Sequence, residues 1–168
     1  VMDAAGVDEA VLVALSCGVA WSVHVAAGHP ERVRGLFAIG PACGFDLPAG
    51  ARDEYVWTAR HPHSRGWAKY NRHHWLEGGY DDFLHFFFGQ MFSEPHSTKQ
   101  IEDAVEWGRD LEPQTLVDTH AGRTGCAGAV CTSIEPICRQ VRCPVTVLHG
   151  SDDQIRPIAY GERLAELT

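Results

Sequence analysis

The stretch Ala10–Trp21, AVLVALSCGVAW, decides the fold that this sequence predicts. Its first six residues, Ala10–Leu15, are all apolar, and a short apolar run of this kind is typical of a buried strand. The following segment, Cys17–Ala27, repeats its apolar residues at helical spacing and is followed by Gly28, a common helix stop. We therefore expect a tight turn from strand to helix, with Ser16 at the turn.

A serine at such a turn has two interpretations. Ala14-Leu-Ser-Cys-Gly18 departs from the G-x-S-x-G pattern only by alanine at the first small position. In that pattern the serine is a nucleophile held in strained backbone, and its neighbours two residues away must be small. The other interpretation is that Ser16 caps the helix, which serine does well. The strand before it and the small-residue helix after it favour the nucleophile.

Two more segments predict strands that are buried on both faces, Val33–Ile39 and Pro144–His149. A helix that opens near Pro157 follows the second of them, with apolar residues at i, i+4 and i+7. The order strand, helix, strand, long insert, strand, helix predicts an α/β fold, a partial doubly wound parallel sheet.

The loop after the last predicted strand carries carboxylates. Its sequence is His149-Gly-Ser-Asp-Asp-Gln-Ile-Arg-Pro157. Catalytic groups in open α/β sheets gather at this edge, and an acid here can orient a histidine during acyl transfer. Asp153 is our first candidate and Asp152 the second, although aspartate is also favoured in turns for its own hydrogen bonds.

The insert has a composition of its own. Twelve of the sixteen aromatic residues fall between Tyr55 and Trp107. Helices are predicted from Tyr80, with Phe83, Phe87 and Met91 on one face, and after a capping box that begins at Ser97. We expect a helical lid over residues 48–133, inserted between core segments 1–47 and 134–168, and its phenylalanines either form the lid core or face a pocket.

Charge and hydropathy exclude several classes of function. The net charge is −8, and no basic block could follow a phosphate backbone, so no nucleic-acid partner is expected. No apolar run approaches the ~20 residues that cross a bilayer, so no membrane partner is expected either. A small-molecule substrate and a cytoplasmic location are the default expectations, although an export signal upstream of Val1 would not be seen.

The cysteines do not predict a metal site. They lie at positions 17, 43, 126, 131, 138 and 143, and the C-x4-C-x6-C-x4-C spacing of the last four is looser than zinc sites use. We expect no metal, no cofactor and no disulfide framework.

Together these segments resemble the α/β-hydrolase superfamily, specifically its lidded members with a serine nucleophile. The resemblance rests on VDEAVLVALSCG, HPERVRGLFAIGPA and RCPVTVLHGSDDQIRP. It implies that Ser16 is the nucleophile, Asp153 the acid, and the Cys17 N–H half of the oxyanion hole. It also implies a catalytic histidine beyond Thr168 and further strands before Val1, so we expect a fragment of a larger domain that is inactive by itself.

The resemblance favours a serine hydrolase that cleaves a small apolar ester or related acyl compound through an acyl-enzyme. A serine nucleophile argues against the epoxide hydrolase and haloalkane dehalogenase branches, whereas carbon–carbon bond hydrolysis and perhydrolysis stay open. His149 is expected to be structural, and the histidines of the insert are expected mostly at its surface. The alternative is a hydrolase-like binding or regulatory module without chemistry, since a fold does not by itself determine function.

Overall fold

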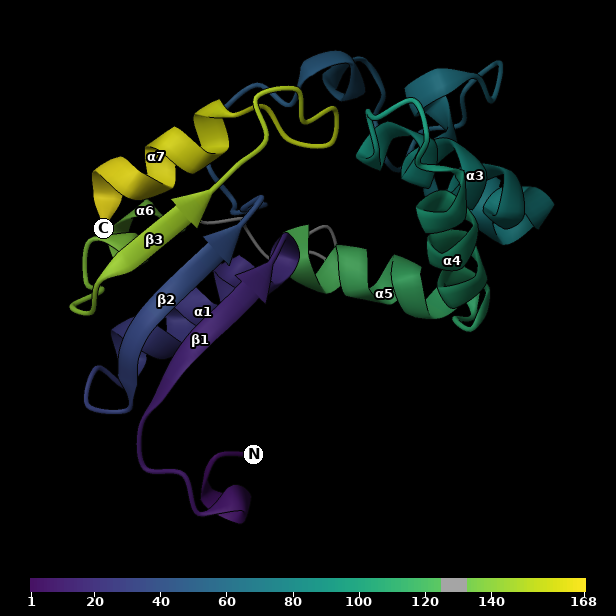
Figure 1. The fold of residues 1–168 in the computed structure, drawn as a ribbon. Coiled ribbons are helices and arrows are strands. Elements are labelled where there is room, and N and C mark those ends of the chain that lie inside the picture. Colours follow the sequence, from purple (N-terminus) through teal and green to yellow (C-terminus); the bar gives the residue numbers. More distant parts are fainter. Residues whose placement is uncertain (125–132) are drawn as a thin grey trace. The chain divides into compact units, whose positions relative to one another are not determined.

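The computed structural model describes residues 1–124 and 133–168, and it divides into two units. The sheet unit comprises Val1–Leu47 and Thr132–Thr168, and the helical unit comprises Pro48–Cys131 (Figure 1). The described helices include none that is both long and apolar enough to span a membrane.

The sheet unit is built on three parallel strands in the order β1-β2-β3 (Figure 1). Their bounds are β1 (Ala10–Leu15), β2 (Val33–Ile39) and β3 (Val145–Leu148). The predicted parallel α/β fold is confirmed, and the first two strands have the predicted bounds. The third is one residue shorter at each end than predicted. The last residues of the strands are in register, so all three strands end at one edge of the sheet.

The described residues of this unit form four helical segments: η1 (Asp3–Ala5), α1 (Cys17–Gly28), α6 (Glu135–Cys138) and α7 (Ala159–Leu167). Helices α1, α6 and α7 share one hydrophobic core with the sheet. Alternate strand residues enter that core, among them the paired Leu12 and Leu36 and the paired Ala14 and Ala38. The period-2 alternation of a strand places these residues on one face of the sheet.

The expectation that the strands are buried on both faces is wrong for β1. The intervening residues of β1, which point to the other face, are 61% exposed at Val11, 70% at Val13 and 65% at Leu15. The reason is that α1, α6 and α7 all contribute to the core on the same face. Although β1 is apolar throughout, one of its faces is buried and the other is exposed to solvent in this structure.

The helical unit contains no strand among its described residues. Its elements are η2 (Gly50–Glu54), η3 (Gly66–Lys69), α2 (Arg72–His74), η4 (Trp75–Gly79), α3 (Tyr80–Met91), α4 (Thr98–Arg109) and α5 (Pro113–Thr124). They surround an aromatic core in which Trp75 is 1% exposed and its ring lies 4.3 Å from that of Phe83, centroid to centroid. The concentration of aromatic residues in this part of the sequence is therefore used to build a core.

Two details of the helical unit differ from the predictions. Met91 is 43% exposed, so the buried face of α3 does not extend to it. The predicted capping box at Ser97 does not form, because the Ser97 hydroxyl donates to Glu94 Oε2 at 3.2 Å and makes no bond to the helix. The backbone of Ser97 (φ −89°, ψ 19°) is not extended, as a capping residue usually is.

Asn71 organises the start of the helical unit. Its side chain is 2% exposed, and its Nδ2 donates to the carbonyls of Trp57 at 2.9 Å and Ala59 at 2.8 Å. Its Oδ1 accepts from the backbone N–H groups of His73 and His74, which caps α2. One amide side chain therefore joins an irregular segment to a helix.

Candidate active site

Ser16 lies between β1 and α1 in a strained backbone conformation. Its dihedral angles are φ 54° and ψ −119°, and it is the only non-glycine residue with positive φ in the part of the chain that the structure describes. Its N–H donates to Ile39 O at 2.9 Å, and its carbonyl accepts from the N–H of Ala42 at 3.2 Å. Strain of this kind costs about 1–3 kcal/mol and persists only where the surrounding structure enforces it.

The Ser16 hydroxyl does not cap the helix. Its side chain makes no capping hydrogen bond to α1, and its contact with Cys17 Sγ is 4.0 Å long. A sulfur acceptor at that distance is weak. The structure thus lacks the interaction on which the capping interpretation rests, and the half-buried hydroxyl is left without a strong partner among the described residues.

The residues two positions away from Ser16 are small because the turn is close-packed. Ala14 is 8% exposed, and a Cβ atom added at Gly18 would lie 3.9 Å from the Ala14 Cβ. That distance is ordinary van der Waals contact, so alanine at position 14 fits opposite glycine at position 18. Larger side chains at both positions would compete for the same space.

Asp153 is held in the loop after β3 by several hydrogen bonds. Its Oδ1 accepts from the N–H groups of Ile155 at 2.7 Å and Arg156 at 2.8 Å, and its Oδ2 lies 3.2 Å from His149 Nε2. Asp152, the second candidate, is exposed, and among the described residues its carboxylate accepts a hydrogen bond from Gln154 alone. Of the two carboxylates, Asp153 has the fixed orientation that an orienting acid requires.

Both candidates lie at the same edge of the sheet. Leu15, Ile39 and Leu148 are paired across the strands, and Ser16 and Gly40 directly follow the first two of them. Gly40 has φ 50°, and a Cβ atom added to it would lie 3.7 Å from Asp153 Oδ2. Asp153 therefore approaches the end of β2, the strand that neighbours the one carrying Ser16.

His149 contacts the loop after β3 that carries Asp153. Its side chain is 4% exposed, and its Nε2 also lies 3.0 Å from the carbonyl oxygen of Arg156. Its ring packs so closely on α7 that a Cβ atom added at Gly161 would lie 2.6 Å from Nδ1. These contacts are those of a structural residue, as expected from the sequence. The His149–Asp153 contact itself was not expected.

The buried thiols of Cys43 and Cys138 have raised pKa values. Burial, with smaller contributions from neighbouring Cys138 and Cys17, raises the pKa of Cys43 to about 12. Burial likewise raises the pKa of Cys138 to about 11. The described cysteines, Cys17, Cys43, Cys138 and Cys143, are free, and the predictions that concern Cys126 and Cys131 lie outside the described residues.

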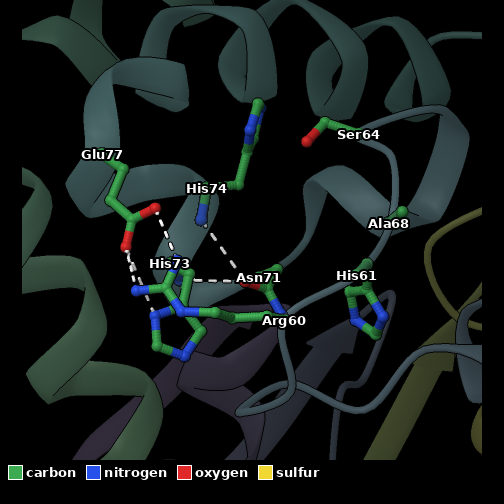
Figure 2. Close-up of a pocket in the computed structure, with 8 residues that line it drawn as sticks. All are labelled: Arg60, His61, Ser64, Ala68, Asn71, His73, His74 and Glu77. Atoms are coloured by element: carbon green, nitrogen blue, oxygen red, sulfur yellow. Dashed lines mark hydrogen bonds and ion pairs between the residues drawn. The ribbon is translucent and has the colours of Figure 1, made fainter.

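A separate cavity of about 210 Å³ lies within the helical unit (Figure 2). It brings together three of the insert's histidines, His61, His73 and His74. Figure 2 shows Arg60 and Glu77 joined at one side, where both guanidinium Nη atoms donate to the carboxylate at 2.9 and 2.7 Å. These hydrogen bonds pair the Arg60 guanidinium with Glu77. They also hold the pKa of Glu77 below its usual value.

Comparison with known proteins identifies the fold. No protein-family model matches the sequence, and no curated protein matches it. Among solved structures, the chain is similar to the esterase RhEst1 from Rhodococcus sp. ECU1013, with a TM-score of 0.65, 20% identity and coverage of 99% of this chain and 56% of the other. It is equally similar to the meta-cleavage product hydrolase from Pseudomonas fluorescens IP01 (TM-score 0.65, 18% identity, 99% and 55% coverage). The enol-lactonase from Burkholderia xenovorans LB400 gives a TM-score of 0.63 at 17% identity, with 99% and 56% coverage.

The chain therefore has the α/β-hydrolase fold, and it spans about half the length of the solved structures that it matches. Those structures are an esterase, a meta-cleavage product hydrolase and an enol-lactonase. Because one fold serves several reactions, the particular chemistry has to be argued from the site.

Proposed function

We propose that the protein is a serine hydrolase in which Ser16 forms an acyl-enzyme with a small, mainly apolar ester or related acyl substrate. The observation that carries this proposal is the backbone of Ser16, a strained non-glycine residue that follows β1 and presents a hydroxyl without a strong partner among the described residues. Strain at one defined residue is a feature of functional sites, because it is otherwise removed by substitution with glycine.

In the proposed reaction the Ser16 Oγ attacks the substrate carbonyl carbon while a histidine removes the hydroxyl proton. The resemblance implies that this histidine follows Asp153 in chain order. The 168 residues contain no histidine after His149. The same histidine then protonates the leaving alcohol. Water hydrolyses the acyl-enzyme, which releases the acid and restores Ser16.

The N-terminus of α1 supports stabilisation of the intermediate. Cys17 is the first residue of α1, and the first N–H groups of a helix have no intrahelical acceptor. The Cys17 N–H is the proposed donor to the oxyanion, with the positive end of the helix dipole behind it. Removing one such donor typically costs about 10²–10³-fold in rate.

Asp153 is the proposed orienting acid. Its Oδ1 is bound to two backbone N–H groups, whereas the polar partner that its Oδ2 has among the described residues is His149 Nε2. A carboxylate has about four lone-pair positions, so a second donor can still bind at Oδ2. The fixed carboxylate would hold the catalytic histidine in the correct tautomer.

A fluorophosphonate probe tests this function in the full-length natural protein. Covalent labelling at Ser16, found by mass spectrometry and lost in Ser16→Ala, is the expected result. An unlabelled Ser16, together with unchanged ester hydrolysis in Ser16→Ala, would show that the nucleophile is wrongly assigned.

The His149 contact gives some support to the second candidate function, a binding module without chemistry. His149 already occupies one side of the Asp153 carboxylate. This candidate predicts no labelling and no hydrolysis in a protein that is folded and still binds acyl compounds. The fluorophosphonate experiment therefore separates the two functions.

A further inference from the structure

Arg156 is a buried cation that has no counter-charge among the described residues. The residue is 9% exposed, and its Nε atom is buried without a hydrogen-bond partner. Within residues 1–124 and 133–168, no carboxylate forms an ion pair with it and no acceptor receives a hydrogen bond from its guanidinium. The sequence gives little signal for this site beyond a basic residue between Ile155 and Pro157.

A buried charge without an anion beside it is unfavourable, and the Nε atom of this guanidinium is sealed from solvent without a partner. The compensation that the structure provides is partial. The guanidinium carbon lies 5.1 Å from the centroid of the Tyr160 ring, within the range of a cation–π interaction. The Tyr160 hydroxyl donates to Leu47 O at 2.7 Å, which fixes that ring in place. A held but unpaired cation is suited to an anion that arrives with a ligand.

The backbone of Arg156 is part of the proposed acid loop. Its N–H donates to Asp153 Oδ1 at 2.8 Å, and its carbonyl oxygen lies 3.0 Å from His149 Nε2. Asp153 thus contacts the backbone of Arg156 and forms no ion pair with its side chain. This arrangement leaves the carboxylate free of a competing cation, and it leaves the guanidinium free for a different anion.

We propose that Arg156 binds a carboxylate group of the substrate, remote from the carbonyl that is attacked. This inference rests on the proposed function and names the substrate class, an otherwise apolar acyl compound that carries a carboxylate. A guanidinium is planar and presents paired N–H donors, a geometry that matches a carboxylate. The buried position strengthens the interaction, because the local dielectric is lower than in water.

Binding is tested without any requirement for activity. The full-length natural protein is titrated with dicarboxylates from malonate to adipate, and its melting temperature and calorimetric affinity are measured. At least one of these probes should raise the melting temperature of the wild type, and Arg156→Met should weaken its affinity at least tenfold. The matched control is Arg34→Gln, since Arg34 is a cation of the same unit whose side chain is 70% exposed and pairs with Glu9.

Hydrolysis is tested with two esters of equal carbon count in the acyl chain, methyl hydrogen glutarate and methyl valerate. The wild type should prefer the anionic ester, and Arg156→Met should reduce that preference in kcat/KM at least tenfold, mainly through KM. Arg156→Lys should retain part of the preference, because it keeps the charge and loses the paired donors.

The outcomes separate this inference from the proposed function. If Ser16→Ala abolishes hydrolysis while Arg156→Met changes neither ester preference nor dicarboxylate affinity, the Arg156 site is wrong and the hydrolase stands. If Ser16→Ala hydrolyses normally while dicarboxylate binding depends on Arg156, the hydrolase assignment fails and the anion site stands. A wild type that is stabilised by none of the dicarboxylates overturns the Arg156 site.

Loss of folding does not confuse the result. Methionine is apolar and of similar length, so it removes an unpaired charge from a buried position and should leave the melting temperature of the free protein equal or higher. A folded Arg156→Met protein with wild-type affinity for the dicarboxylates contradicts the proposal directly.

Discussion

His149 Nε2 lies 3.2 Å from Asp153 Oδ2, so the proposed acid is held by a buried histidine four residues earlier in the chain. The two residues are at the end of β3 and in the loop that follows it. Together with the backbone bonds to Oδ1, this contact leaves the carboxylate little freedom to rotate. A fixed carboxylate is useful for catalysis because it costs no reorganisation during the reaction.

Asp153→Asn tests the orienting role. Asparagine keeps an oxygen for the two backbone N–H groups, but its NH2 group cannot accept a bond from a catalytic histidine. We expect kcat to fall by roughly 10³–10⁴-fold with folding retained. Steady-state kinetics of the full-length protein provide the measurement. Asp152→Asn is the control, and an equal loss in both variants would argue against a specific role for Asp153.

Ser16→Gly tests the backbone strain. Glycine adopts positive φ readily, so Ser16→Gly should be more stable than Ser16→Ala. We expect its free energy of unfolding to be about 1 kcal/mol larger, after the entropy cost of glycine is subtracted. Both variants lack the hydroxyl, and both should lose ester hydrolysis. Urea unfolding compares their stabilities. If the alanine variant is the more stable one, the strained conformation is not present in solution.

Gly161→Ala tests the packing of His149 on α7. The added Cβ would lie 2.6 Å from His149 Nδ1, and the ring is too buried to move away easily. We expect a loss of about 1–3 kcal/mol in unfolding free energy. Gly89→Ala in α3 is the matched control, because nothing lies within 4 Å of its added Cβ, and it should gain up to about 1 kcal/mol. Equal effects would mean that the ring is not packed as described.

The pKa of Cys43 predicts a loss of stability in alkali. Burial raises the pKa to about 12 in the folded state, from an ordinary value of 9.0. The stability that this shift provides is complete below pH 9 and is lost as the pH rises toward 12, because only the unfolded state releases the proton in that window. The slope is about 1.4 kcal/mol per pH unit.

Comparison with Cys43→Ala isolates this contribution. Between pH 9 and pH 10.5, the stability difference between wild type and Cys43→Ala should fall by about 2 kcal/mol. Urea unfolding at several pH values measures it. A difference that stays constant across this range would show that the Cys43 thiol titrates normally.

Asn71→Asp tests the start of the helical unit. A carboxylate cannot donate to the Trp57 and Ala59 carbonyls, and it would be buried against them. We expect a loss of about 1–3 kcal/mol or more, followed through tryptophan fluorescence of the helical unit. Gln100→Glu makes the same change from amide to acid at an exposed position of α4 and should change stability by less than about 0.5 kcal/mol. Similar losses in both variants would contradict the role of Asn71.

Local patterns in the sequence were sufficient for the strands, for helices α1, α3, α4 and α7, and for the choice of Ser16 and Asp153 as candidates, whereas α5 was not predicted. Apolar runs, helical periodicity and turn residues act over a few neighbouring residues, and they can be recognised without knowledge of the fold. The turn at Ser16 is such a feature, since a strand that meets a helix over a single serine leaves few backbone conformations available.

Only the tertiary structure decided which face of β1 is covered, that His149 contacts Asp153, and that Arg156 is buried with no ion pair to any described residue. Each of these depends on elements that are distant in sequence or on how a loop closes. The failed capping box at Ser97 has the same origin, because the Glu94 carboxylate takes the hydroxyl that the pattern assigned to the helix. Burial and hydrogen-bond pairing depend on which groups meet in space, and local sequence patterns do not contain that information.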